Sequence, residues 1–438
     1  MSLISGLEIG RRSLNAYKSA ITITGHNVSN VGNPNYTRQK PDLEPATPQS
    51  GIPSGVDLET VSRQRDRFAD LKYREQAASL GRWDVQTGYL EQVEGIVGGD
   101  GEGSLTDLMN RFWNGWHDLA NSPESEASRI SLIQSALALT DKLNEISSSL
   151  NSVRSALNDM IEDKVSRVND LLEEVADLNV KIASLIRSGG NPSDLQDRRD
   201  AVLDELSRLA SIGYSDGGDG SVSVRIGGVT LVEGAESSQI NLQRSSDGDL
   251  IPVHDEIRLR VNAGEIGGLI ELGDKLDKII GRMDEMAGSL IERINELHSS
   301  GYGLDGSSGV PFFSGENASD IAVNPDLIDA PEKVAASGRP DAPGDNSVAL
   351  AIAQLRSQFD EHHASTVALI GSQTAQAERE AENGEILLRQ IGAYRQGEFG
   401  VSLDEELTNL IRFQRAYQAA AKFVSSIDEL LQTVINMM

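Results

Sequence analysis

Residues 123–188 read PESEASRISLIQSALALTDKLNEISSSLNSVRSALNDMIEDKVSRVNDLLEEVADLNVKIASLIRS, and no glycine or proline follows Pro123 in this stretch. Apolar residues recur every three or four positions over much of it, at Leu150, Val153, Leu157, Ile161, Val165, Val168, Leu172 and Val175. This spacing predicts a long amphipathic helix, on the order of 90 Å if uninterrupted. Ser122 fits its cap and Ser188-Gly189-Gly190 its end. The pattern leaves open one continuous helix or two helices with a hinge around Ser147–Ser149.

The two ends of the chain share an amphipathic helical pattern. Its apolar positions are Leu7, Leu14, Tyr17, Ile21 and Val28 at the start, and Leu403, Leu407, Leu410, Phe413, Tyr417, Val424, Ile427, Leu431 and Val434 at the finish. Their spacing favours coiled-coil packing of helix on helix. Residues 1–40 carry five basic groups and one acid, whereas residues 400–438 carry three basic groups and five acids. Opposite charge favours pairing of the two segments, in one chain or between subunits, and these positions are the expected packing residues.

The middle of the chain has a different character. Turn-forming clusters between residues 213 and 263 separate short alternating runs such as SVSVRI and VTLVEG, which predict a small module of β-hairpins. Residues 299–345 are rich in glycine and proline and predict an irregular surface connection. Further helices are expected at about 58–95, 104–120, 193–211, 265–298 and 346–396.

We therefore expect a mainly α fold with nested domains. Terminal helices (1–40 with 400–438) enclose a long-helix rod (41–212 with 264–399), and the rod carries the β module (213–263) as a small projection. The chain has 39 basic and 67 acidic residues, a net charge of −28, which argues against nucleic acid or an anionic membrane as a partner. Cysteine is absent, and no apolar run reaches the roughly 20 residues of a membrane span.

No residue pattern indicates an enzyme, a cofactor or a metal site. His362-His363 point to different faces of a predicted helix and make a poor metal pair. No nucleophile and base stand at a spacing that supports catalysis. The N-terminus lacks the apolar core of a secretory signal peptide, so export from the cell needs another route.

The segment NVSNVGNPNYTRQK (27–40), directly after the first apolar stripe, resembles the signature of the flagellar rod, hook and hook-associated proteins. The matching residues are Asn27, Asn30, Pro34, Tyr36, Arg38 and Gln39. Asn35 stands where that family usually has glycine, and asparagine tolerates the same turn geometry. Residues 402–436, with RFQRAY at 412–417, resemble the family's closing helix. Internal segments, among them DLQDRRD (194–200) and GEIGGL (264–269), favour a hook-associated member that joins the hook to the filament.

The resemblance implies a structural protein without cofactors, located outside the cell in the bacterial flagellum at the hook–filament junction. It implies export through the flagellar type III channel without a cleaved signal peptide, and a coiled coil of the terminal helices that forms on polymerisation. The expected partners are further copies of the chain, the hook protein, a second hook-associated protein or the filament side, and a dedicated export chaperone. The alternatives are a hook or distal-rod subunit and, more remotely, a stalked adhesin or enzyme.

Overall fold

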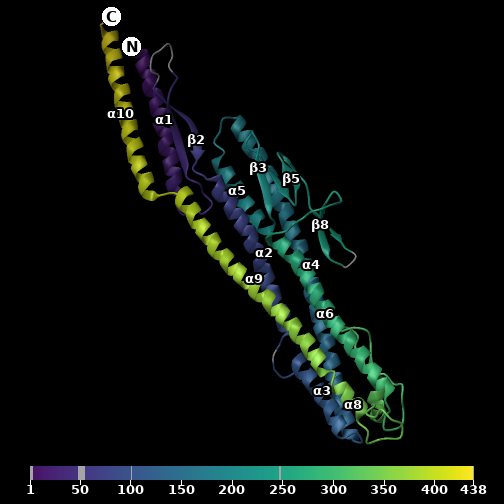
Figure 1. Ribbon diagram of the computed structural model, residues 1–438. Coiled ribbons are helices and arrows are strands. Elements are labelled where there is room, and N and C mark those ends of the chain that lie inside the picture. The colour runs from purple at the N-terminus through teal and green to yellow at the C-terminus, as the bar shows by residue number, and fades with distance from the viewer. Residues whose placement is uncertain (1–2, 48–54, 100, 246–247, 438) are drawn as a thin grey trace.

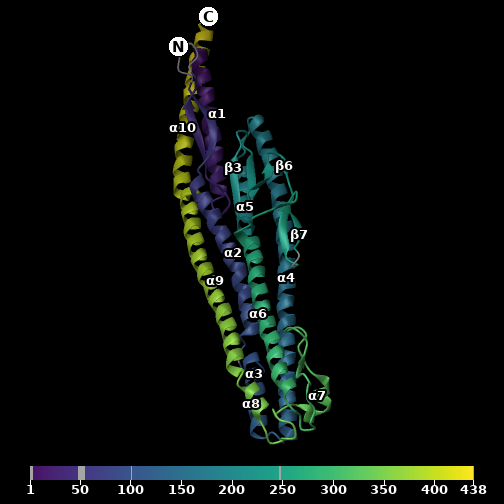
Figure 2. The ribbon, with the colours of Figure 1, turned by 45° about the vertical axis from the view of Figure 1, so that its right-hand side comes forward.

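The computed structural model describes residues 3–47, 55–99, 101–245 and 248–437 and shows a rod of long helices with a small β-rich insert, confirming the expected fold class (Figure 1; Figure 2). Both chain termini lie at one end of the rod. The helices are α1 (Leu3–Ser29), α2 (Arg67–Val97), α3 (Leu105–Asn121), α4 (Glu126–Arg187), α5 (Ser193–Leu209), α6 (Gly264–Ser300), α7 (Pro325–Asp329), the 3-10 turn η1 (Pro331–Lys333), α8 (Ser347–Ala353), α9 (Arg356–Phe399) and α10 (Leu403–Asn436).

The long central segment folds as one continuous helix, α4, of 62 residues. Its N-cap is Ser125, whose Oγ accepts from the backbone N–H of Ser128 at 3.1 Å, so the helix begins three residues after Pro123. It ends at Arg187 with Ser188 as its C-cap, and Gly189 follows with φ of +76°, a conformation that glycine adopts without strain. The continuous helix decides between the two arrangements that the sequence left open.

The rod's core lies where α4 packs on α3, α5 and α6, and where α2 packs on α6 and α9. The apolar stripe of α4, including Leu150, Val168 and Val175, is fully buried there. At the end farthest from the termini, Phe112, Trp113 and Trp116 of α3 are also fully buried. These contacts make the rod a packed body in its own right.

The β module forms two antiparallel sheets beside α4. Its strands are β3 (Ile212–Asp216), β4 (Val222–Ile226), β5 (Val229–Glu233) and β6 (Glu236–Ser237) in one sheet, and β7 (Asn241–Arg244), β8 (Leu250–His254) and β9 (Ile257–Arg258) in the other. Two asparagines of α4 hold it: Asn179 donates to the carbonyls of Val222 and Gly234, and Asn169 to that of Ile240, at 2.8–2.9 Å.

Four expectations about local structure are wrong. The N-cap of α4 is Ser125 and not Ser122, which instead caps the C-terminus of α3. The helix expected from residue 58 begins only at Arg67, because residues 56–63 form strand β2 (Val56–Arg63), which pairs with β1 (Gln39–Pro45). The helix expected at 346–396 is interrupted at residues 354–355, between α8 and α9. The connection 299–345, which includes the short strands β10 (Phe313–Ser314) and β11 (Ala322–Val323), is not confined to the surface. Its apolar side chains Phe312, Phe313, Ile321, Leu327 and Val334 are buried, because they cover the ends of α4 and α6.

Candidate functional site

The terminal helices α1 and α10 lie side by side and antiparallel, away from the core of the rod (Figure 1). The buried positions of α1 are mostly small: Gly6, Gly10, Ala16, Ala20, Thr24 and Asn27. A Cβ placed on Gly10 would lie 2.3 Å from Cγ2 of Val424, and one on Gly6 would lie 2.7 Å from Cδ1 of Ile427. The helices therefore approach closely through glycine, and bulky side chains of α10 fill the space.

Most of the packing residues expected from the sequence are not buried by this pairing. Phe413 and Ile427 are buried, at 5% and 7% exposure. The rest remain partly or largely exposed: Leu7, Leu14, Tyr17, Ile21, Val28, Leu403, Leu407, Leu410, Tyr417, Val424, Leu431 and Val434. Exposed Phe423, Leu430 and Ile435 of α10, which the stripe did not include, add to this apolar surface. The helix pair thus presents a long apolar face that the single chain does not cover.

The end of α1 is fixed by the amide side chain of Asn27. Its Nδ2 donates to the carbonyl of Gln39 at 2.8 Å and to Oε2 of Glu406 at 2.9 Å. Its Oδ1 accepts from the hydroxyl of Tyr36 at 2.7 Å and from the backbone N–H of Gln39 at 3.0 Å. One buried residue therefore joins the end of α1, the following turn and the start of α10. Burial raises the pKa of Tyr36, with Asp194 nearby adding to the effect, which keeps the hydroxyl a donor.

Glu406, on the first turn of α10, is the residue that sequence reasoning missed here. It is 2% exposed and accepts from Nε of Arg38 at 2.8 Å, while Arg38 also reaches Glu405 at 2.6 Å. The sequence did contain one indication of its burial: Glu406 and Phe413 are seven residues apart, which puts both on one helix face.

The same turn is tied to the rod through the N-terminus of α5. The backbone N–H of Thr37 donates to Oδ2 of Asp197 at 2.9 Å, and Nε2 of Gln39 donates to Oδ1 of Asp194 at 2.8 Å. The remaining signature residues play smaller parts: Asn30 donates to the carbonyl of His26 at 3.0 Å, and Pro34 is exposed in the turn. The signature and the DLQDRRD segment, which had seemed separate motifs, therefore meet at one place.

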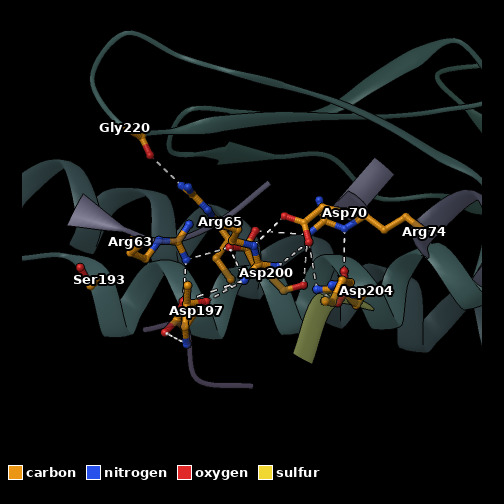
Figure 3. A network of polar contacts seen from close by, with 12 residues as sticks. Arg63, Arg65, Asp70, Arg74, Ser193, Asp197, Asp200, Asp204 and Gly220 are labelled. Atoms are coloured by element: carbon orange, nitrogen blue, oxygen red, sulfur yellow. Dashed lines mark hydrogen bonds and ion pairs between the residues drawn. The ribbon is translucent and has the colours of Figure 1, made fainter. Parts of the chain in front are cut away.

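Beneath this turn lies a cluster of alternating charges, shown in Figure 3, which we call the joint cluster. It consists of Arg63, Arg65, Asp70, Arg74, Asp197, Asp200, Asp204 and Arg395. Arg63 bonds Asp197 at 2.7 Å and Asp200 at 2.9 Å, and Arg395 of α9 bonds Asp204 at 2.9 Å. The three aspartates of α5 are spaced three and four residues apart and thus share one helix face.

The protonation of Asp200 shows how the joint cluster is balanced. Burial acts to raise the pKa of this carboxyl group, but Arg65, Arg63 and Arg74 outweigh burial and lower it to about 2. Asp200 is therefore a carboxylate at neutral pH, and the joint cluster links β2, α2, α5 and α9 through ion pairs that solvent barely reaches. Ion pairs of this kind can fix the orientation of the helix pair relative to the rod.

Two further kinds of site are absent from the described residues. Among them, no group of three or more histidine, aspartate or glutamate side chains is arranged to hold a metal ion. No helix within the described ranges combines the length and apolar composition that crossing a membrane requires.

Comparison with known proteins gives two family matches. Residues 90–313 match the family described as the helical domain of flagellar hook-associated protein FlgK, and residues 398–437 match the C-terminal family of the flagellar basal body rod FlgEFG proteins. The first covers the rod from α2 to β10, and the second covers α10.

Individual relatives point the same way. Flagellar hook-associated protein 1 of Bacillus subtilis is 31% identical over 99% of this chain and 98% of its own length. The protein of the same name from Escherichia coli is 22% identical over 97% of this chain and 98% of its own length. A solved structure titled as the flagellar hook junction protein FlgK of Burkholderia pseudomallei shares the fold, with a TM-score of 0.51, 22% identity, and coverage of 56% of this chain and 46% of that one.

Proposed function

The chain belongs to the family of flagellar hook-associated protein 1, a structural protein of the hook–filament junction, and we propose that its terminal helices are the segments through which it polymerises there. The observation that carries this proposal is the apolar face of the α1–α10 pair. Leu403, Leu407 and Val434 are 44–46% exposed in the single chain. Many exposed apolar side chains on one pair of helices are typical of a surface that another protein covers.

Each of the three nested parts of the chain has its own proposed role. Residues 1–40 with 400–438 form the polymerising unit, residues 41–212 with 264–399 form the rod, and residues 213–263 form a small projection. The joint cluster and Asn27 hold the polymerising unit at a fixed angle to the rod. We infer that the copies stack with the helix pairs innermost, because that arrangement covers the apolar side chains that the single chain leaves exposed.

The partners follow from this role. Copies of the chain itself, the hook protein on one side and a second hook-associated protein or the filament on the other are the proposed neighbours. We further propose export through the flagellar type III channel, with the exposed stripe of α10 shielded beforehand by a chaperone. An apolar helix is the surface that such a chaperone can hold in a groove.

Immuno-electron microscopy of intact flagella tests the location. Label is expected as a single short zone where the hook meets the filament. A strain that lacks the chain is expected to keep complete hooks and to release its filaments into the medium. Label along the whole filament, or loss of the hook itself, would contradict the proposal.

A further inference from the structure

A cavity of about 310 Å³ lies beside the joint cluster, between α5, the start of α2 and the turn before β4. Its charged lining consists of four arginines and three aspartates: Arg63, Arg65, Arg67, Arg199, Asp70, Asp200 and Asp216. The hydroxyl-bearing residues Tyr214 and Ser221 complete its polar wall. In a chain with a net charge of −28, a cavity with more arginines than acids needs a physical reason.

Arg199 is the residue that sets this cavity apart. It is 6% exposed, and its Nη1 donates to Oδ1 of Asn179 at 2.8 Å and to the carbonyl of Gly220 at 2.7 Å. Its Nε is buried and has no hydrogen-bond partner among the described residues. It also forms no ion pair within the described part of the chain, since the neighbouring Asp200 is bound by Arg63, Arg65 and Arg74. A buried guanidinium without an acid is costly, because it loses its hydration.

A second unpaired donor lies behind the same wall. Arg74 is 3% exposed, and its Nη1 is buried without a hydrogen-bond partner among the residues that the structure describes. The guanidinium of Arg74 stacks on the ring of Tyr214, which lines the cavity, at 4.5 Å. Two buried arginines, one lining the cavity and one behind the ring of Tyr214, thus each have an N–H donor without a partner among the described residues.

The charges around the cavity do not balance. The joint cluster, Arg67 with its partner Asp216, and Arg199 together contain six arginines and five aspartates. Every one of these arginines except Arg199 is ion-paired to an aspartate. Burial is the main cause that lowers the pKa of Arg199. The charges of Arg63 and Arg74 add to this effect, while those of Asp200 and Asp216 oppose it.

We propose that this cavity binds an oxyanion, a phosphate or a carboxylate, with Arg199 at its base and Arg67 at its rim. A guanidinium binds such a group through two parallel N–H donors, and a negative charge here removes the surplus. The oxyanion comes either from solution or from an acidic side chain of a second copy, since the surface of every copy is rich in acids. Bound there, it connects α5 with the β module, whose Gly220 and Ser221 form one wall.

Thermal unfolding of the full chain in inorganic phosphate at constant ionic strength tests the site. A binding site gives a melting temperature that rises and then saturates, whereas the general effect of phosphate on protein stability rises without saturation. In Arg67→Ala, the concentration at half-saturation is expected to increase about tenfold, as for the loss of one charged hydrogen bond. In Asp216→Asn it is expected to fall, because a competing carboxylate is removed.

Arg67 and Asp216 suit this test because their side chains are 69% and 43% exposed, so that neither variant endangers folding. Arg111→Ala, at an exposed position on α3, is the matched control and is expected to behave like the parent. A rise without saturation that is equal in all four proteins would overturn the proposal.

Sedimentation equilibrium identifies the source of the oxyanion. Self-association that phosphate weakens and that Arg67→Ala lacks indicates an acidic side chain of a second copy. A monomer at all concentrations, with saturable phosphate binding, indicates an ion from solution. The test uses the isolated chain, so its outcome does not depend on whether the chain acts at the hook–filament junction.

Discussion

Asn27 uses all four of its amide hydrogen-bonding positions, and this gives the first prediction. In Asn27→Asp an oxygen replaces Nδ2 and faces the carbonyl of Gln39 and the carboxylate of Glu406. We expect the helix pair to loosen from the rod and unfolding to become easier by roughly 3 kcal/mol, as for other uncompensated buried charges. Asn30→Asp is the matched control, because Asn30 lies one helical turn away and donates at a solvent-exposed position. Equal unfolding free energies for the two variants in urea would contradict this role of Asn27.

Asp200 gives a prediction about pH. Its pKa of about 2 in the folded protein is lower than the ordinary value of 3.8, so the deprotonated group stabilises the fold above about pH 4. This contribution is about 2 kcal/mol. It is lost as the pH falls from 4 toward 2, because Asp200 takes up its proton at a higher pH in the unfolded chain than in the folded one. We expect Asp200→Asn to reduce the decline in unfolding free energy over this range. Asp326→Asn, at an exposed position of α7, is expected to leave the decline unchanged.

At the scale of helices, the close approach of α1 and α10 predicts opposite effects for one substitution at two sites. Alanine favours a helix over glycine by about 1 kcal/mol. Gly25→Ala is expected to gain most of this, because no heavy atom lies within 4 Å of the new Cβ. Gly10→Ala is expected to be destabilising, because its Cβ meets Cγ2 of Val424 at 2.3 Å. Circular dichroism melts of the two variants provide the measurement, and a gain in stability for Gly10→Ala would show that the helices are not in close contact.

The elements that the sequence predicted well are those with a long, regular apolar period. In α4 the apolar side chains from Leu150 to Val175 are buried in the rod, as expected for a helix that packs on several others. The terminal stripes mislead in one respect, because their buried contacts on α1 come from glycine and alanine while the larger residues stay exposed. Hydrophobic periodicity identifies an amphipathic face but does not say which neighbour covers it. Strand β2 was missed since its pairing with β1 is a contact between segments, which local pattern does not report.

The contacts that hold the helix pair on the rod could be predicted only in part. The signature around Asn27 was recognisable, but its partners Glu406, Asp194 and Asp197 lie at least 155 residues away along the chain. In so acidic a sequence, single carboxylates carry no local signal, and only the folded arrangement shows which ones face arginines. The spacing of Asp197, Asp200 and Asp204 on one helix face was the available indication of a polar contact.

At the scale of the whole molecule, the last prediction concerns the difference between the rod and the α1–α10 helix pair. The rod folds around its own core, whereas the helix pair has apolar side chains that the single chain leaves exposed. The double variant Leu403→Asp, Tyr417→Asp places a charge at two such positions. The native side chains there are 44% and 37% exposed in the single chain. We expect the unfolding free energy of the isolated chain to change by less than about 1 kcal/mol, as is usual for surface substitutions.

In cells, the same variant is expected to leave hooks intact and to release filaments, because two charges per subunit cannot be buried in the assembled junction. The control is Thr408→Asp, Ser425→Asp, which adds the same charge at exposed positions of α10. One helical turn from Ser425 lie Ala421, Lys422, Asp428 and Glu429, none of which belongs to the exposed apolar side chains of the helix pair. Electron microscopy of hooks and an assay of filament protein in the medium separate the two variants. If both released filaments equally, charge alone would explain the loss, and the apolar face of the helix pair would not be the surface that polymerises.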